Sequence, residues 1–517
     1  MSGSEKRIEE IDCLSLLAHK VASNVFDLSS RQFNVSIRDQ LVRAQQLITD
    51  LKQAHPESRS LLIVGMGAAG MTAALAACEA GFDKVRIVDT KDQPFSLFRN
   101  VKGRFVGPYM YEWPSAFHGN QSYPSHDTAA WGGYGRSPLS WEAEHPISAD
   151  ELAEQLTQSV QNWIATALKF NPPLPIPAFY VNVGPRQIGS FVKDFAQREA
   201  VRAIEDEHGA YQSEKVLLGS MGAGAVPWNG LAAMPAQPFA PDYVIIAAGM
   251  GTEVVRVPGA LQPASPSFWA DDDLKSPAVT KGRIVVLGGG DGAIQDTLRI
   301  LTRHDHPLSL IRDIESAPAV RGALQDELPA LLSIDRQLRQ HGSWSRDSSG
   351  LAMADAACKR AAARLACNLA VVRQVRKTLR PGTGQVLHIV RGQHFDKAYL
   401  LNRFVIYLLE QCLSVKPGRS TPYMRFKLSF GVDVKRCVDR RRKAKGYKAA
   451  WTLGLGRPAS KSANRSIDAD KVVVRFGVDP SSIPGATMIQ ISERVSRQRS
   501  TLTRVELPFV AMGRKRA

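Results

Sequence analysis

The stretch Leu61–Gly70, LLIVGMGAAG, decides the fold of this 517-residue chain. An apolar run over residues 61–64 leads directly into the pattern Gly65-x-Gly67-x-x-Gly70. The first glycine of such a pattern permits a tight turn, the second lets the backbone approach a pyrophosphate, and the third lets helix and strand pack closely. The N-terminus of the following helix faces the phosphate charge. The stretch therefore predicts a strand, turn and helix that bind a dinucleotide.

The residues after this turn extend it into a βαβ unit. Ala74 adds a small residue to the helix, and the next apolar run, KVRIVD, ends on Asp89, 19 residues after Gly70. A carboxylate at this position accepts hydrogen bonds from a ribose diol. Strand, glycines, helix and terminal acid occur together within about 30 residues, which is the context that supports the motif. The alternative is a buried strand–turn–helix unit without a ligand.

A second copy of the motif begins about 220 residues later. The segment RIVVLGGGDGAIQDTLRIL, residues 283–301, contains Gly288-x-Gly290-x-x-Ala293. Pro307 ends the expected helix, and we predict LSLIRDIE as the next strand, which places Asp313 20 residues after Ala293. Two such units in one chain predict two dinucleotides.

Three motifs in this order resemble the two-dinucleotide-binding flavoproteins, which include flavin-containing monooxygenases and pyridine-nucleotide reductases. They are the first glycine turn with Asp89, the strand DYVIIAAG ending at Gly249, and the second glycine turn. The resemblance covers roughly residues 58–110 and 240–316. It implies that the first unit holds the ADP half of FAD, that the strand ending at Gly249 passes the flavin, and that the second unit holds NAD(P)H.

The nicotinamide coenzyme is open between two forms. Asp313 at the end of the predicted strand favours a free 2′-hydroxyl and hence NADH. Arg312 beside it, and Ala293 in place of a third glycine, favour the 2′-phosphate of NADPH.

The sequence departs from the resembling group in two places. Reductases of the group carry a CxxC or CxxxxC pair, whereas the six cysteines here have neither spacing (Cys13, Cys78, Cys358, Cys367, Cys412 and Cys437). The group usually has a late strand ending in Gly-Asp, but no Gly-Asp follows the strand in ADKVVVRFGVDP, residues 469–480. We therefore expect the reduced flavin, rather than a dithiol, to act on the second substrate.

The predicted fold class is α/β, with two Rossmann-like three-layer dinucleotide-binding domains. A helical segment precedes the first domain and either packs on it or mediates self-association. A basic helical insertion at about 320–465 lies in the second domain and faces a substrate or partner. The expected boundaries are 1–57 for the N-terminal extension, 58–260 for the FAD-binding domain, 278–480 for the NAD(P)-binding domain and 481–517 for a C-terminal return segment.

Catalytic side chains are less evident than cofactor turns. The aromatic-rich segment 91–136 follows Asp89, so we expect it to pass near the flavin ring, where Trp113, His118 and His126 are candidates for catalysis. The alternative is that these side chains make ordinary core contacts. His304 and His306 suggest a metal site only weakly, because histidines at a helix end more often cap it, and we predict no metal.

Charge is concentrated in one segment of the chain. The chain carries 66 Lys and Arg against 49 Asp and Glu, a net charge of +17. Residues 416–461 hold 14 basic and two acidic side chains, together with aromatic residues that are able to stack on bases. This segment is compatible with binding a polyanion or nucleic acid. Alternatives are a solvated basic surface or attraction for an anionic substrate or NADPH, and no known nucleic-acid module accompanies the charge.

Together these features favour an FAD-dependent oxidoreductase that takes hydride from NAD(P)H and acts on a small molecule. Hydroxylation by a monooxygenase is slightly favoured over direct reduction or oxidation of the substrate. The alternatives are a nucleotide-binding sensor or scaffold, or a flavoprotein that acts on nucleic acid through the basic insertion. The charged N-terminus, the scattered cysteines and the absence of an apolar run of about 18 residues predict a cytoplasmic protein without a membrane span.

Overall fold

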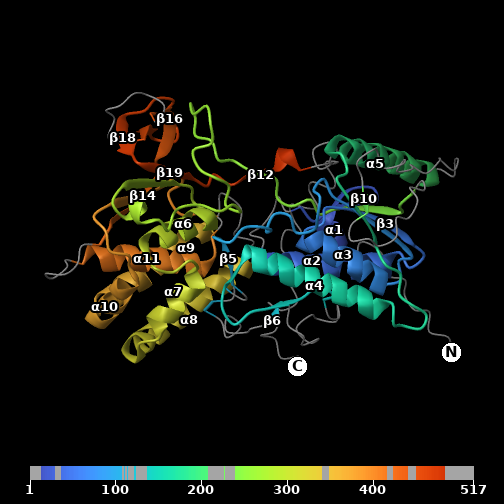
Figure 1. The fold of residues 1–517 in the computed structure, drawn as a ribbon, viewed down its shortest axis with the longest axis horizontal. Helices are drawn as coiled ribbons and strands as arrows, with labels where there is room; N and C mark the ends of the chain where they lie inside the picture. Colours follow the sequence, from blue (N-terminus) through green and yellow to red (C-terminus); the bar gives the residue numbers. More distant parts are fainter. Residues whose placement is uncertain are drawn as a thin grey trace.

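The computed structural model shows two lobes joined by short crossing segments (Figure 1). It describes residues 13–29, 36–107, 110, 113–114, 122–123, 137–207, 226–227, 239–340, 349–396, 398–415, 423–440 and 450–483. No helix within these ranges is both long enough and apolar enough to cross a bilayer.

The first lobe is built on a seven-stranded sheet whose five inner strands are parallel. Its order is β1 (Lys20–Ala22), β2 (Val25–Asp27), β11 (Tyr243–Ile246), β3 (Ser60–Val64), β4 (Lys84–Val88), β9 (Ala178–Val181) and β10 (Val226–Pro227). The two outer strands, β1 and β10, are antiparallel to their neighbours. Strand β3 is buried along its whole length, as expected for a parallel strand covered on both faces.

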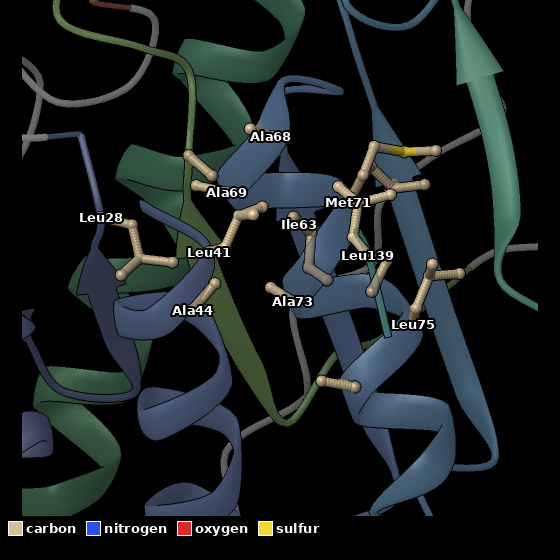
Figure 2. Close-up of a cluster of buried hydrophobic side chains, with 14 of the residues drawn as sticks. Leu28, Leu41, Ala44, Ile63, Ala68, Ala69, Met71, Ala73, Leu75 and Leu139 are labelled. Carbon is tan, nitrogen blue, oxygen red and sulfur yellow. The ribbon is translucent and has the colours of Figure 1, made fainter. Parts of the chain in front are cut away.

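Helices cover both faces of this sheet. Alternate strand residues such as Leu61 and Ile63 face a core formed with α1 (Leu14–His19), α2 (Ile37–Ala54), α3 (Ala68–Glu79) and α4 (Ala149–Ala167). The intervening residues, Leu62 and Val64, face α5 (Pro185–Glu207) on the other side. Figure 2 shows Leu41 of α2 and Ile63 of β3 in the core beside α3.

The N-terminal extension is partly a strand unit, whereas the sequence predicted only helix. Helices α1 and α2 flank a hairpin that turns at Asn24, and β2 of this hairpin joins the main sheet beside β11. Each strand has only three residues, too few to show an alternating pattern. Helix α2 packs against α3, which agrees with packing on the first domain.

The second lobe has three layers. Its central sheet is parallel, in the order β15 (Arg425–Phe430), β14 (Gln385–Val390), β13 (Arg283–Leu287) and β19 (Lys471–Val474). An antiparallel sheet of β16 (Asp433–Asp439), β17 (Trp451–Gly456) and β18 (Arg465–Ala469) packs on one face. The other face is covered by α6 (Asp291–Leu301), α7 (Pro307–Glu315), α8 (Pro318–Gln340), α9 (Ser349–Ala366), α10 (Leu369–Thr378) and α11 (Leu400–Ser414).

The predicted strand LSLIRDIE is wrong, because these residues form helix α7. His306 caps the helix by accepting a hydrogen bond from Leu308 N, and Pro307 occupies its first turn. The buried residues fall at helical spacing: Leu308, Leu310, Ile311 and Ile314. The strand that follows α6 in the sheet is β14, which begins only at Gln385.

The expected basic helical insertion at 320–465 also differs from the structure. Helices α7–α10, between Pro307 and Thr378, separate α6 from β14. The range also contains β14 and β15 of the central sheet, and β16 and β17 of the antiparallel sheet. The described residues of the basic segment therefore lie mainly on strands rather than helices.

Short elements complete the two lobes. Strand β12 (Thr252–Glu253), leaving the first lobe, pairs with β20 (Val478–Asp479), returning from the second. The remaining pairs are β5 (Phe105–Val106) with β8 (Ile147–Ser148) and β6 (Ser122–Tyr123) with β7 (Trp141–Glu142). The 3-10 helices are η5 (Pro277–Thr280) and η6 (Pro480–Ser482).

Candidate dinucleotide sites

The first glycine turn has the shape that the sequence predicts. Gly65 has a φ of +108°, and a Cβ on it would overlap the carbonyl oxygen of Ala247. A Cβ on Gly70 would overlap the carbonyl oxygen of Gly65. Gly67 differs, since a Cβ on this residue would meet no atom of the described residues within 4 Å. Packing within the fold therefore explains Gly65 and Gly70, whereas Gly67 faces open space of the kind that a ligand fills.

The N-terminus of α3 is suited to an anion. Gly67 is its N-cap and contributes no side-chain hydrogen bond, and its first turn carries no acidic residue. The amide groups of a helix's first turn lack partners within the helix, and the helix dipole adds positive character there. This end of α3 therefore fits the pyrophosphate of a dinucleotide.

Asp89 lies where the sequence places it, directly after β4 and beside the turn. Its Oδ2 accepts a hydrogen bond from Met66 N at 2.6 Å, and its Oδ1 accepts one from Lys91 N at 2.8 Å. An ionised carboxylate has about four acceptor positions, so these bonds leave capacity for a ribose hydroxyl. Asp89 thus orders the turn and remains chemically suited to its predicted role.

Gly249 lies at the same edge of the first sheet. Strands β11, β3 and β4 are parallel, so their carboxyl ends bring Gly249, the Gly65 turn and Asp89 to one edge. Ligands of parallel α/β sheets bind outside this edge. Among the residues that the structure describes, no atom lies within 4 Å of a Cβ placed on Gly249. The predicted residues of the first site therefore gather at one place.

The second glycine turn repeats the backbone of the first. Gly288 has a φ of +143°, Gly290 is the N-cap of α6, and Ala293 is fully buried. A Cβ on Gly288 would overlap the carbonyl oxygen of Arg475 and lie 3.2 Å from the Cβ of Ala293. This close packing explains why residue 293 is small. The three residues predicted for the second turn are thus brought together.

A buried histidine that the sequence did not reveal supports this turn. His388 of β14 has its Nε2 2.8 Å from the carbonyl oxygen of Gly288 and its Nδ1 3.0 Å from the hydroxyl of Thr297. Burial lowers the pKa of His388 to about 4, so the ring is neutral at physiological pH. Finding it in the sequence would have required recognising QVLHIV as the second strand.

The first turn of α6 differs from that of α3 because it contains an acid. Asp291 Oδ1 accepts hydrogen bonds from Tyr399 N at 2.9 Å and from Asn402 Nδ2 at 2.5 Å. Burial raises the pKa of Asp291 to about 6. The loop that contains Tyr399 also reaches the turn at Asp396, whose N donates to the carbonyl oxygen of Gly289 at 2.8 Å. The carboxylate of Asp291 therefore links the start of α6 to Tyr399 and Asn402 by hydrogen bonds.

Asp313 does not occupy the ribose position predicted for it. It lies on α7, where its Oδ2 is 2.8 Å from His304 Nε2. The position after the second parallel strand belongs instead to Arg391, which follows β14. Its side chain is 74% exposed, and its Nε lies 3.7 Å from Asp433 Oδ2. The sequence missed Arg391 because it misplaced this strand.

Of the catalytic candidates, the structure describes only Trp113, and it does not lie at the first turn. Trp113 is buried and stacks on Phe404 of α11, with ring centroids 5.0 Å apart. It belongs to the core of the second lobe, so the structure gives it ordinary core contacts. His118 and His126 lie outside the described residues.

A buried ion network lies between the lobes. Arg104 comes from the first lobe, Asp272 from the crossing segment, and Asp296, Arg299 and Arg475 from the second lobe. Asp296 is fully buried and pairs with Arg104 and Arg475, and with Arg299 at 3.3 Å. Asp272 pairs with Arg104 at 2.7 Å and with Arg299 at 2.8 Å. Because three segments supply these charges, the network fixes how the lobes meet.

Compared with the two glycine turns, the described residues give less indication of a metal site, a reactive thiol or a polyanion site. Within the described ranges, no three His, Cys, Asp or Glu side chains form a group able to hold a metal ion. The cysteines form no disulfide, and Cys367 is the exposed one among them. Arg425, Lys427 and Arg436 are exposed on β15 and β16, but residues 416–422 and 441–449 lie outside the described residues. Polyanion binding by this segment stays a prediction.

Comparisons with known proteins give distant similarities only. No family model matches the chain, and no curated protein matches it. A bacillithiol disulfide reductase from Staphylococcus aureus is similar over 81% of this chain and 76% of that one, with 10% identity and a TM-score of 0.34. A thioredoxin reductase from Lactococcus lactis is similar over 81% and 78%, with 10% identity and a TM-score of 0.31. A 2-naphthoyl-CoA reductase is similar over 88% of this chain and 41% of that one, with 12% identity and a TM-score of 0.28.

The strand order of the chain itself carries the structural conclusion. Each lobe contains a parallel sheet with a glycine turn after one of its central strands, and the crossing pair β12–β20 connects the lobes. The chain thus has two α/β lobes, each with a parallel sheet and a glycine turn at the carboxyl end of a central strand.

Proposed function

We propose that this chain is an FAD-dependent oxidoreductase that receives reducing equivalents from NAD(P)H. The observation that carries the proposal is the contrast within the first turn. A Cβ on Gly65 or Gly70 would overlap backbone atoms, whereas a Cβ on Gly67 would meet no atom of the described residues within 4 Å. Gly67 also begins a helix whose first turn has no acidic side chain and no side-chain cap. No contact with the described residues requires a glycine at position 67, and the missing side chain leaves room for a phosphate beside the helix N-terminus.

The residues of the first site suit the ADP half of FAD. The N-terminal amides of α3 would face the pyrophosphate, and Asp89 would accept hydrogen bonds from the adenosine ribose. A bound flavin supplies the redox chemistry, and the chain supplies position and electrostatics.

The second site suits a nicotinamide dinucleotide, and Arg391 favours the phosphorylated form. The glycine turn is held from beneath by His388, which fixes the carbonyl of Gly288. A guanidinium after the second strand suits a 2′-phosphate, whereas an acidic residue there would suit a free ribose. Asp313, the residue that favoured NADH, lies on α7 and not at the end of the second strand. We therefore propose NADPH as the preferred reductant.

Thiol chemistry has little support among the described cysteines. Burial raises the pKa of Cys78, Cys358 and Cys412, which keeps these thiols protonated and poorly nucleophilic. Cys367 is exposed and directly follows the C-terminal end of α9. The reduced flavin would then act directly on the second substrate. The reduced flavin would lead either to hydroxylation of a small molecule or to its direct reduction or oxidation.

An absorbance spectrum of the purified chain, with and without added FAD, tests the first step. Bands near 370 and 450 nm are expected for bound flavin, and their absence after FAD addition would remove the proposal. Anaerobic stopped-flow mixing with NADPH or NADH tests the second step, with faster bleaching expected for NADPH. A flavin that neither coenzyme reduces would favour the alternative of a nucleotide-binding sensor or scaffold.

Product analysis in air separates the two reaction types. A panel of candidate small molecules is incubated with NADPH and the holoenzyme, and substrate-dependent NADPH oxidation is followed together with product mass. Incorporation of one atom from labelled oxygen gas would establish monooxygenation. Turnover that proceeds equally without oxygen would establish direct reduction.

A further inference from the structure

The N-terminal strand β2 reaches the edge of the first sheet where the dinucleotide site lies. It pairs in parallel with β11, with Val25 opposite Val244 and Asp27 opposite Ile246. β11 in turn pairs in parallel with β3, which leads into the Gly65 turn. The carboxyl ends of these three strands therefore share one edge, and ligands of parallel sheets bind outside that edge.

The residues at the end of β2 are joined to the end of β11 by hydrogen bonds. Leu28 N and Ser29 N donate to the carbonyl oxygen of Ile246 at 2.8 and 3.3 Å. Ser29 Oγ accepts from Ala248 N at 3.0 Å. Asp27 Oδ1 accepts from Ser29 N at 2.8 Å and fixes the turn in which the serine lies. Asp27, Leu28 and Ser29 are all buried, so these bonds are shielded from water.

Ala248, whose N–H donates to Ser29, packs directly against the Gly65 turn. A Cβ on Gly65 would lie 2.9 Å from Ala248 Cα, so the backbone at 248 passes directly over the turn. Ala248 is followed by Gly249, whose missing Cβ leaves open space at the same edge. A shift of the backbone at Ala248 and Gly249 would therefore change the space available to a ligand beside the Gly65 turn.

Apolar packing ties the same N-terminal turn to the start of α3. Leu28 is 2% exposed and belongs to the core cluster that contains Leu41 of α2 and Ala68 and Ala69 of α3. Figure 2 shows Leu28 on the side of this cluster that faces Leu41 and Ala69. The N-terminal segment thus contacts the site from two directions, through the backbone at 248 and through the first turn of α3.

We propose that the N-terminal strand is part of the flavin site and that Ser29 is a positioning residue within it. Ser29 holds Ala248 and Gly249 beside the Gly65 turn, and through them sets the space for the flavin dinucleotide. This inference rests on the proposed FAD binding. The N-terminal extension would then affect FAD affinity directly, in addition to stabilising the first lobe.

The test compares three variants at position 29 with the full-length wild type. Ser29→Ala and Ser29→Cys remove the hydroxyl acceptor, and Ser29→Thr keeps it. Ser15→Ala is the matched control, because Ser15 donates to Asp50 at 2.5 Å within the same extension but away from the sheet edge. The probe is FAD. Its dissociation constant is measured by fluorescence titration, and the visible circular dichroism of the bound flavin reports its placement.

We expect Ser29→Ala and Ser29→Cys to raise the dissociation constant by up to about tenfold. Without the hydroxyl, FAD binding must order Ala248 and Gly249, and the cost is at most that of one net hydrogen bond, about 1.4 kcal/mol, which corresponds to that factor. Both variants should also alter the visible dichroism, whereas Ser29→Thr and Ser15→Ala should resemble the wild type. Should Ser29→Ala fail to fold, Ser29→Cys supplies the comparison.

Different failures have different meanings. A wild type that binds no FAD would overturn the proposed function itself. Wild-type affinity and dichroism in folded Ser29→Ala or Ser29→Cys would overturn only the role of Ser29. Equal losses in Ser29→Ala and Ser15→Ala, in step with their melting temperatures, would show that the extension serves stability alone and would overturn the inference.

Discussion

Replacing Gly67 by alanine should separate ligand binding from folding. Gly67 has φ −80° and ψ −173°, an extended conformation that alanine adopts freely. The added Cβ has no neighbour within 4 Å in the described part of the chain. Reduced entropy of the unfolded chain favours the variant by about 0.4–1 kcal/mol, and alanine is a poorer N-cap than glycine. These effects oppose each other, so we expect the free energy of unfolding to change by less than about 1 kcal/mol.

The same methyl group should weaken FAD binding strongly. A phosphate oxygen that accepts from a backbone N–H lies about 2.9 Å from the nitrogen. A methyl group on the adjoining Cα competes for that space, so the pyrophosphate must retreat. Each hydrogen bond to a charged group contributes about 1.5–3 kcal/mol, and about 1.4 kcal/mol corresponds to a tenfold change in affinity. Loss of one such bond predicts a dissociation constant about 10- to 100-fold higher.

Two measurements on Gly67→Ala and one control decide the matter. Urea unfolding of the apoprotein gives the stability, and fluorescence titration with FAD gives the affinity. Gly70→Ala is the control, because its Cβ would overlap the carbonyl oxygen of Gly65, so that variant should lose stability as well as binding. Unchanged FAD affinity in a folded Gly67→Ala protein would refute the ligand interpretation of the open space.

Two further predictions concern charged side chains of the second lobe. Asp296→Asn leaves Arg104, Arg299 and Arg475 with a single buried carboxylate, that of Asp272. We expect it to lower the free energy of unfolding, measured by urea titration, by about 3–5 kcal/mol. As a control, Arg59→Ala breaks the exposed Arg59–Asp83 pair and should change this free energy by less than about 1 kcal/mol. Burial raises the pKa of Asp291 from 3.8 to about 6, so the folded chain holds more protons than the unfolded chain between these values, and stability falls as pH rises through them. Asp291→Asn should therefore exceed the wild type by roughly 2–3 kcal/mol at pH 7 and match it below about pH 4, and equal stability at pH 7 would contradict the burial argument.

The features predictable from sequence were those set by neighbouring residues. Gly65, Gly67 and Gly70 are fixed by one turn and its helix, and the turn appears as predicted. The same holds for Ser148, which accepts a hydrogen bond from Glu151 N at 3.1 Å at the start of α4. Such local rules do not depend on what the rest of the chain does.

The features that the sequence missed depend on distant parts of the chain. LSLIRDIE has an apolar pattern that fits a short strand or a helix, and the choice of helix follows from its burial against α8, α10 and α11. The second strand, β14, is separated from α6 by α7–α10, so distance along the chain gave no guide to Arg391 or His388. β2 has three residues, and its place beside β11 follows from pairing across more than 200 residues.

The two glycine turns share a backbone shape but are supported in different ways. The first has an uncharged helix start and is supported by buried N-terminal residues. The second carries Asp291, and the same helix carries Asp296 five residues later, in the ion network that reaches Arg104 of the first lobe. The helix of the second turn is therefore joined directly to the first lobe by buried charges. Because breaking a buried pair is costly, this network favours one orientation of the lobes, and that orientation sets the distance between the two turns.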